Sequence, residues 1–432
     1  MRFLVMAPGL RLIGGFALML AMEIPAWGQD NRVTLLPEDA RRGIVHLVSL
    51  VGPGPPEAFH PDELAGLLRF VDQRKDPEAV YVADSIDGAS SGYLDVDVRM
   101  EMAEFLKRTF HPTVPWFTTT PSSLRLTVWS KPDQPGQGFP RLWELLDSTG
   151  PPVVIRGMET VENTPDLFTG SYYRYELFRT LVLFRNGDRR VLISLSRQAG
   201  PSGVGKKGYI LGQDDDWNYF YSGEPGLTVT GLGWVRSHMY DSIGITIYTE
   251  MDRAAATVRA ANIKWVRAGW SQINVVTRDH IIRGMQRFAR TLKAILESPR
   301  LPSVQTMEAD MARISQLTDA EIRERIRAYR AVLAVRSERA KDGDRKSLPE
   351  SFWDEGVWSR MTREEMESTL ILENFKAHLG KITEEEMCRL MLAPSSPVPC
   401  RWGQGRSLNE EPPADSPAPI TLMPTVSASR PN

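Results

Sequence analysis

Residues 172–184 read YYRYELFRTLVLF and carry the densest β-strand signal of the chain. β-branched and aromatic residues dominate this stretch, and polar residues alternate in its first half, as in a half-buried strand. Asn186-Gly187 follows, and Val191–Ser196 is a second apolar run. Asn-Gly between two apolar runs favours a tight turn, because both central residues of a type I′ turn need a positive φ. The sequence therefore predicts a β-hairpin here.

The register of this hairpin depends on the length of its loop. A two-residue Asn186-Gly187 loop sets Val182 opposite Val191 and makes one face strongly apolar, and this is the register we expect. A three-residue loop would instead set Leu183 opposite Val191. In both registers Ile193 lies mid-strand beside apolar residues, so we expect its side chain to be buried.

Two later patterns extend the hairpin into a sheet. Large apolar residues alternate along two further short stretches, which are Trp217, Tyr219 and Tyr221 and then Ile243, Ile245 and Ile247. Alternation with period two is typical of strands with one buried face. We therefore expect an antiparallel sheet of at least four strands.

The remaining chain divides by composition around this sheet. The predicted fold class is α+β, with a central antiparallel β-sheet, a mixed N-terminal part and a helical C-terminal part. The predicted parts are a cleaved signal peptide (1–28), a mixed α/β region (29–150), an antiparallel β-rich core (151–252), a helical region (253–393) and a disordered Pro-rich tail (394–432).

Several local elements follow from shorter signals. Ile44–Val51 reads as a strand, and Pro61 opens a helix that runs to Gln73. Apolar residues at helical spacing predict another helix over Asp279–Leu296. Three Thr-x-x-Glu capping boxes mark helix starts, namely Thr318 with Glu321, Thr362 with Glu365, and Thr383 with Glu386.

The N-terminus has the pattern of a secretory signal. Arg2 and Arg11 are its positive charges, Leu12–Met22 is an apolar run, and Ala26-Trp27-Gly28 supplies the small residues of a cleavage site. A spanning helix needs about 20 apolar residues, so this run is too short to be a membrane anchor. We expect an exported protein, periplasmic or secreted, with no transmembrane segment in its mature chain.

Cysteine content and charge set further bounds. Cys388 and Cys400 are the two cysteines, and an oxidising compartment would allow a disulfide between them. The net charge of −2 and the pI of about 6.4 argue against a nucleic-acid binder. The six histidines are scattered and form no metal-binding spacing, so no metal site and no cofactor is predicted.

One motif suggests catalysis. Gly88-Ala89-Ser90-Ser91-Gly92 matches the Gly-x-Ser-x-Gly elbow that carries the nucleophile of serine hydrolases on a strand-to-helix turn. A base would come from His238 or His280, and an orienting acid from Asp215 or Asp241. The alternative is a polar surface loop, because Gly, Ser and Asp are common in loops for conformational reasons.

Another motif suggests phosphate binding. Gly200–Lys207 resembles the phosphate loop of nucleoside monophosphate kinases, but Lys207 replaces the magnesium-binding hydroxyl and no helix is predicted after it. We therefore interpret it as a connection between strands.

Other residues suggest binding without catalysis. Trp217, Tyr219 and Tyr221 would present an aromatic surface to an apolar ligand. Residues 253–300 hold ten Lys and Arg against two acids, and Arg283, Arg287 and Arg290 share one helix face that would meet an anionic surface. Internal pairing or solvation of these arginines is the alternative.

The function expected from these observations is non-catalytic. The sequence favours an exported protein that binds an apolar ligand, an envelope protein or an anionic surface in the cell envelope. The alternative is a serine-type hydrolase in which Ser90 is the nucleophile, His238 the base and Asp215 the orienting acid.

Overall fold

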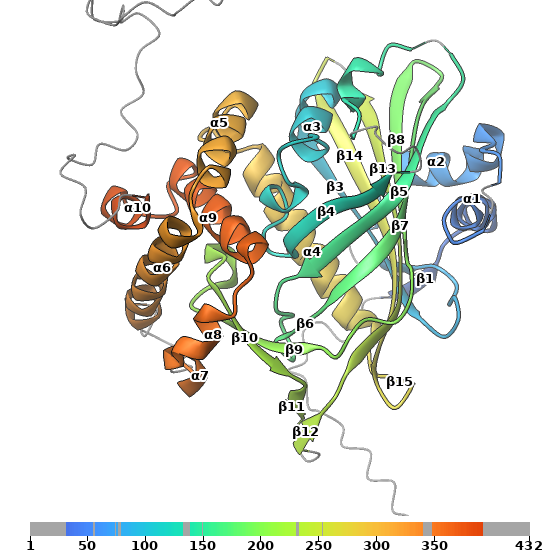
Figure 1. Ribbon diagram of the computed structural model, residues 1–432. Coiled ribbons are helices and arrows are strands. Elements are labelled where there is room, and N and C mark those ends of the chain that lie inside the picture. The colour runs from blue at the N-terminus through green and yellow to red at the C-terminus, as the bar shows by residue number, and fades with distance from the viewer. Residues whose placement is uncertain are drawn as a thin grey trace, which may run out of the picture.

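The computed structural model describes residues 32–391 apart from 55–56, 74, 77–78, 133–138, 149, 230–232, 253 and 340–347. Its centre is a curled antiparallel sheet of eight strands (Figure 1). The order across the sheet is β3 (Ser90–Arg99), β14 (Thr257–Trp270), β13 (His238–Asp252), β8 (Arg189–Gln198), β7 (Arg174–Asn186), β5 (Val153–Asn163) and β4 (Leu124–Pro132). The short β15 (Ile273–Asn274) pairs with the end of β14. The predicted fold class is confirmed.

The hairpin of β7 and β8 exists, but both expected registers are wrong. Its loop is Gly187-Asp188, so Asn186 pairs with Arg189 and Val182 lies opposite Ile193. Gly187 has a φ of +60° and Asp188 has none in the positive range. A positive φ at the first central residue alone is the pattern of a type II′ turn, so glycine is needed there and not at the second position. The slip from the favoured register is two residues, which leaves the same side chains on each face.

The outer face of the sheet is closed by two N-terminal helices, α1 (Glu38–Ser49) and α2 (Ala65–Asp72) (Figure 1). Ile193 is fully buried in the core between them and the sheet, as expected. The predicted strand Ile44–Val51 is wrong, because Ala40, Ile44 and Leu47 repeat at helical spacing and bury one side of α1. A 3₁₀ turn, η1 (Pro61–Leu64), precedes α2, and the parallel pair β1 (Arg32–Leu35) and β2 (Ala79–Val82) lies beside these helices.

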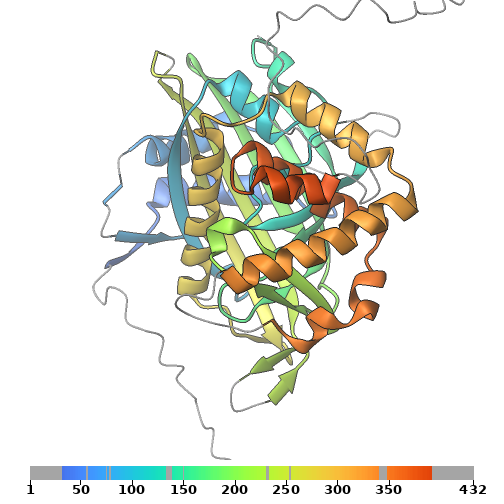
Figure 2. The ribbon, with the colours of Figure 1, turned by 90° about the vertical axis from the view of Figure 1, so that its left-hand side faces the viewer.

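The inner face of the sheet looks toward α3 (Met102–Thr109) and α4 (Arg278–Leu296). Figure 2 shows α4 lying along the sheet, with the C-terminal helices in front of it. Leu181, Leu183, Leu192 and Tyr248 pack with α3 and the C-terminal half of α4. This packing fills one end of the inner face only.

The remaining elements form a second layer. A small sheet of β6 (Ser171–Tyr172), β9 (Lys206–Ile210) and β10 (Tyr219–Pro225) carries the hairpin β11 (Leu227–Val229) and β12 (Gly233–Val235). The 3₁₀ turns are η2 (Trp116–Thr118), η3 (Leu142–Glu144) and η4 (Asp214–Asp216). The helices are α5 (Val304–Ser315), α6 (Asp319–Arg339), α7 (Glu350–Trp353), α8 (Glu355–Ser359), α9 (Arg363–His378) and α10 (Glu384–Met391).

The three predicted capping boxes begin α6, α9 and α10. In each, the glutamate carboxylate accepts from the threonine amide and the threonine hydroxyl accepts from the glutamate amide. The predicted helical region 253–393 needs one correction, because β14 and β15 precede its first helix. Asn262 and Lys264 face one side of β14, while Ile263 and Trp265 face the other, which is strand periodicity.

Two predicted parts lie outside the described residues, namely the signal peptide 1–28 and the tail 394–432. Within the described residues, no helix is both long and apolar enough to cross a bilayer.

Candidate functional site

A cavity of about 440 Å³ lies between the inner face of the sheet and the N-terminal half of α4. This volume falls within the range of roughly 300–1,000 Å³ that is usual for small-molecule sites. Strands β5, β7, β8, β13 and β14 form its floor, and Ile281, Gly284 and Met285 of α4 form one wall. The inner face is therefore filled by side chains at one end and hollow at the other.

The floor of this cavity carries a polar band set by the strand register. One row crosses four strands through Arg179, Ser196, Gly244 and Lys264. The next row crosses the same strands through Leu181, Ser194, Thr246 and Asn262. Of these eight residues, all but Leu181 and Ser194 line the cavity. An apolar sheet face is thus interrupted by hydrogen-bonding and charged groups at mid-strand.

The two cations of the band differ in their surroundings. Arg179 donates through Nε to Glu159 Oε2 at 3.0 Å and through Nη1 to Ser194 Oγ at 3.2 Å, so its charge is paired. Within the described chain, the Lys264 amine makes no hydrogen bond or ion pair. Burial, together with the nearby Arg179 guanidinium, lowers the pKa of Lys264 to about 8.

Apolar side chains surround the band on the cavity's other sides. They come from several strands, from the turn before α4 and from α4 itself, and include Val161, Leu177, Val266, Val276, Ile281 and Met285. The loop between β5 and β6 covers one side with Leu167 and Phe168, whose exposed fractions are 42% and 40%. These two residues therefore line the cavity and are also in contact with solvent.

This covering loop is held in shape by its own hydrogen bonds. Asp166 Oδ1 accepts from the amides of Phe168 and Thr169, each at 2.8 Å, and its other oxygen accepts from Ser171. The Phe168 ring lies against His280 with centroids 4.2 Å apart. His280 in turn completes a capping box with Thr277 at the start of α4, and burial lowers the pKa of its imidazole. The loop is thereby joined to the first turn of α4.

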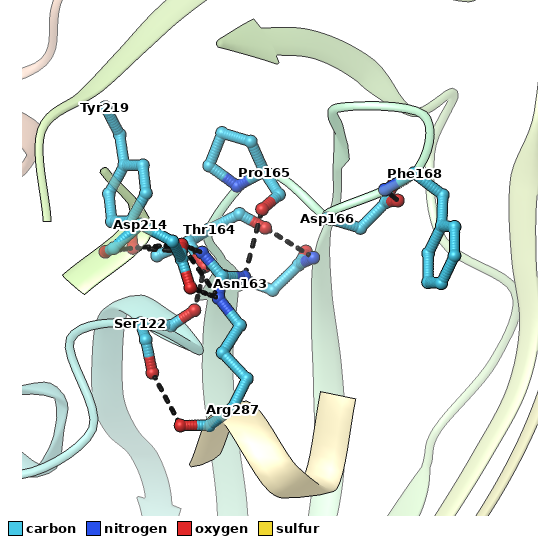
Figure 3. Close-up of polar contacts among 9 residues, drawn as sticks. All are labelled: Ser122, Asn163, Thr164, Pro165, Asp166, Phe168, Asp214, Tyr219 and Arg287. Atoms are coloured by element: carbon cyan, nitrogen blue, oxygen red, sulfur yellow. Dashed lines mark hydrogen bonds and ion pairs between the residues drawn. The ribbon is translucent and has the colours of Figure 1, made fainter. Parts of the chain in front are cut away.

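Arg287 fixes the same loop from the next turns of α4, as Figure 3 shows. It is 5% exposed and donates to both carboxylate oxygens of Asp214, to the Tyr219 hydroxyl, and to the carbonyl of Pro165 at 3.1 Å. Its Nη1 also lies 3.3 Å from Thr164 Oγ1. Because this buried arginine is paired with the half-buried Asp214 carboxylate, it belongs to the frame of the cavity.

The aromatic residues that were predicted to bind a ligand lie outside the cavity. Trp217 is not in a strand: it ends η4 with a left-handed φ of +54°, while Tyr219 and Tyr221 lie in β10. Trp217 and Tyr219 are buried against the helices, and the Tyr221 ring lies 3.8 Å from the Arg125 guanidinium carbon. None of the three lines the cavity, and a ligand role for them stays a prediction.

The predicted basic face of α4 does not act as one surface. Arg287 points inward to Asp214, Arg283 is half-exposed over the Phe168 ring at 5.4 Å, and Arg290 is exposed. The internal pairing considered for these arginines is thus observed at Arg287. Contact of Arg283 or Arg290 with an anionic surface stays a prediction.

The proposed hydrolase residues are not hydrogen-bonded to one another. Ser90 begins β3 after a turn and no helix follows, so the strand-to-helix elbow is absent from this described segment. The Ser90 hydroxyl donates to the Val276 carbonyl at 2.8 Å, and His238 Nδ1 lies 3.1 Å from the Ser202 carbonyl oxygen. Asp215 is in η4, where its carbonyl accepts from Lys381. Each group is therefore engaged with a partner outside the proposed triad.

Three other predictions have different outcomes. A strand, β9, follows Gly200–Lys207, so the helix that a phosphate loop needs is not there. Within the described ranges, no three His, Cys, Asp or Glu side chains gather as metal ligands. Cys388 lies in α10 and Cys400 lies outside the described residues, so their disulfide stays a prediction.

The residues of the cavity floor were missed from the sequence. Asn262-Ile263-Lys264-Trp265-Val266 shows the alternation that could have indicated a strand with a polar inner position. Its place in a basic segment next to a helix concealed that signal. No family model matches this chain, and the searches of curated proteins and of solved structures gave no match either.

Proposed function

We propose that this protein is a non-catalytic binding protein of the cell envelope that holds an apolar ligand between the inner sheet face and α4. The observation that carries the proposal is the preformed cavity, with apolar walls and a small polar band. Ligand sites commonly combine these two features, since the apolar walls contribute affinity and the few polar groups orient the ligand. Export, which the N-terminal pattern predicts, would place such a protein near membranes and their apolar products.

The experiment is extraction of the purified mature protein with organic solvent, followed by mass spectrometry of the extract. Wild type should release an apolar compound in a fixed ratio to protein. Gly284→Leu should release much less, because Gly284 lines the cavity and a side chain there meets no atom within 4 Å of its Cβ. The helix should tolerate leucine well, since glycine is a poor helix former.

Gln286→Leu is the matched control on the same helix. Gln286 is exposed and does not line the cavity, so this variant should release as much compound as wild type. Equal release from all three proteins would contradict the proposal. Labelling of Ser90 by a fluorophosphonate would contradict the proposal that the protein is not an enzyme. Mass spectrometry of the intact protein tests export, because an N-terminus at Met1 or Arg2 would rule out cleavage near Gly28.

A further inference from the structure

The register of the sheet brings a free cation and a free hydroxyl to one place on the cavity floor. Ser196 pairs with Gly244, and Gly244 pairs with Lys264, so the three residues are neighbours across β8, β13 and β14. All three line the cavity. In the described part of the chain, neither the Ser196 hydroxyl nor the Lys264 amine has a hydrogen-bonding partner.

Gly244 places bare backbone between these two groups, with no side chain of its own, and we call the position over this backbone the seat. A Cβ at this position would lie 2.8 Å from Ser196 Oγ and 3.7 Å from Lys264 Nζ. Glycine in a strand interior weakens the strand and often marks a site where a ligand approaches the backbone. A ligand oxygen in van der Waals contact with the Gly244 backbone, farther out than that Cβ, could therefore reach both the hydroxyl and the amine.

The charged side chains around the seat favour a ligand that carries a single negative charge. Arg179, at the far end of the same row, is paired with Glu159, and Arg287 in the α4 wall is paired with Asp214. Asp241 is the acid that favours the charged form of Lys264, without forming an ion pair with it. An ammonium group in a largely apolar cavity carries a desolvation cost that a bound anion would offset.

The walls beyond the seat are suited to a hydrocarbon chain. Met285 and Ile281 of α4 lie close to Gly92, which pairs with Lys264 from the other side. From there, Val266, Val276 and the covering loop continue the apolar lining. A head group at Gly244 would thus have an apolar path leading away from it.

We propose that the ligand is a long-chain carboxylate whose head group occupies the seat over Gly244, held by Lys264 and Ser196. This inference rests on the proposed function and adds the chemical class of its ligand. Lys264 supplies the opposite charge, Ser196 donates a hydrogen bond, and the chain lies against α4.

The test is isothermal titration of delipidated mature protein with dodecanoate, dodecanol and dodecyl phosphate. Wild type should bind dodecanoate at least ten-fold more tightly than dodecanol. Lys264→Met should remove that preference and leave dodecanol binding unchanged. Gly244→Ala should weaken dodecanoate several-fold because it fills the seat. Lys206→Ala, at an exposed lysine of β9 outside the cavity, is the charge-matched control and should behave as wild type.

The outcomes separate this inference from the proposed function. Two results would contradict the inference that the ligand is a carboxylate, while still allowing an apolar ligand. One is equal affinity of wild type for dodecanoate and dodecanol. The other is an unchanged dodecanoate affinity in a folded Lys264→Met variant. Tighter binding of dodecyl phosphate than of dodecanoate would contradict the inference that the ligand head group carries a single negative charge. Binding of none of the three would count against the proposed function itself. Circular dichroism establishes that each variant is folded.

Discussion

Two interior lysines, the buried Lys376 and the half-buried Lys264, occupy differently built regions of this molecule. Lys376 of α9 is 1% exposed and donates to Glu373 Oε1 at 2.8 Å and to Asn218 Oδ1 at 2.7 Å. Arg336 of α6 donates to the same two residues, which closes a polar cluster between the helices. Lys264, on the inner face of the sheet, has no such partner within the described chain.

The pKa values of these lysines alone do not distinguish the two regions. Burial lowers the pKa of both amines to about 8, against the opposing effect of Glu373 on Lys376 and of Asp241 on Lys264. The difference lies in what each charge stabilises. Lys376 and Arg336 lower the pKa of Glu373, so the cluster depends on Lys376. No described group depends on Lys264 in this way. A charge that lines a cavity and that the fold does not use is a candidate functional group.

The largest effect should come from removing Lys376. Lys376→Met should destabilise the protein by about 3 kcal/mol, at the lower end of the range for breaking a buried ion pair, because Arg336 still contacts Glu373. Denaturant unfolding measures this loss. The double variant Lys376→Met with Glu373→Gln should recover part of it, since the carboxylate that has lost one of its two cationic partners is gone. A Lys376→Met variant as stable as wild type would show that the fold does not depend on Lys376, and so would contradict the difference proposed between the two lysines.

The packed outer face gives a second comparison. Ile193→Ala should cost about 2–5 kcal/mol, as large-to-small core substitutions do, because Ile193 is fully buried under α1 and α2. Arg189→Ala should cost at most about 1 kcal/mol, since its ion pair with Asp72 is partly exposed. Equal, small losses in urea melts of both variants would mean that the outer face is not the stable core.

Replacing Lys264 should change the stability of the protein in the opposite direction to replacing Lys376. Lys264→Met should stabilise the ligand-free protein by about 1–3 kcal/mol at pH 7, because a partly desolvated ammonium is replaced by an apolar side chain of similar size. The pKa of Lys264 is about 8 in the folded state and 10.5 without the fold, so the unfolded state binds more protons between these values. The stability of wild type relative to the variant should therefore rise across pH 8–10.5.

The measurement is a pair of unfolding curves at several pH values from 7 to 10.5. Other lysines and tyrosines also titrate in this window, and the difference between wild type and Lys264→Met removes their contributions. A destabilised variant, or a difference that does not depend on pH, would show that Lys264 is part of the fold.

Local signals predicted the capped helices and the existence of the buried hairpin, but they indicated a strand where α1 lies. Each threonine–glutamate capping box needs atoms of one chain segment only, so its pattern is visible in the sequence. Ile193 was correctly expected to be buried because the two registers considered, like the observed one, keep it among apolar neighbours. The turn itself was misplaced by one residue, since Gly187 suits either a type I′ or a type II′ turn.

The cavity could not be predicted from local signals. Its floor depends on the register that places Ser196, Gly244 and Lys264 side by side, although 68 positions separate Ser196 from Lys264 in the chain. Arg287 looked like a surface cation because helical spacing aligned it with Arg283 and Arg290. Its burial depends on Asp214 arriving from η4, which the sequence of the helix does not encode.

The most direct test of this account is nuclear magnetic resonance titration of the amines of Lys264 and Lys376, each assigned with its methionine variant. In delipidated protein Lys264 should titrate with a pKa of about 8. Saturating dodecanoate should raise that pKa toward or above 10.5, since the carboxylate favours the charged amine, while Lys376 should not move. A pKa near 10.5 for Lys264 in the free protein, or one that dodecanoate leaves unchanged, would contradict it.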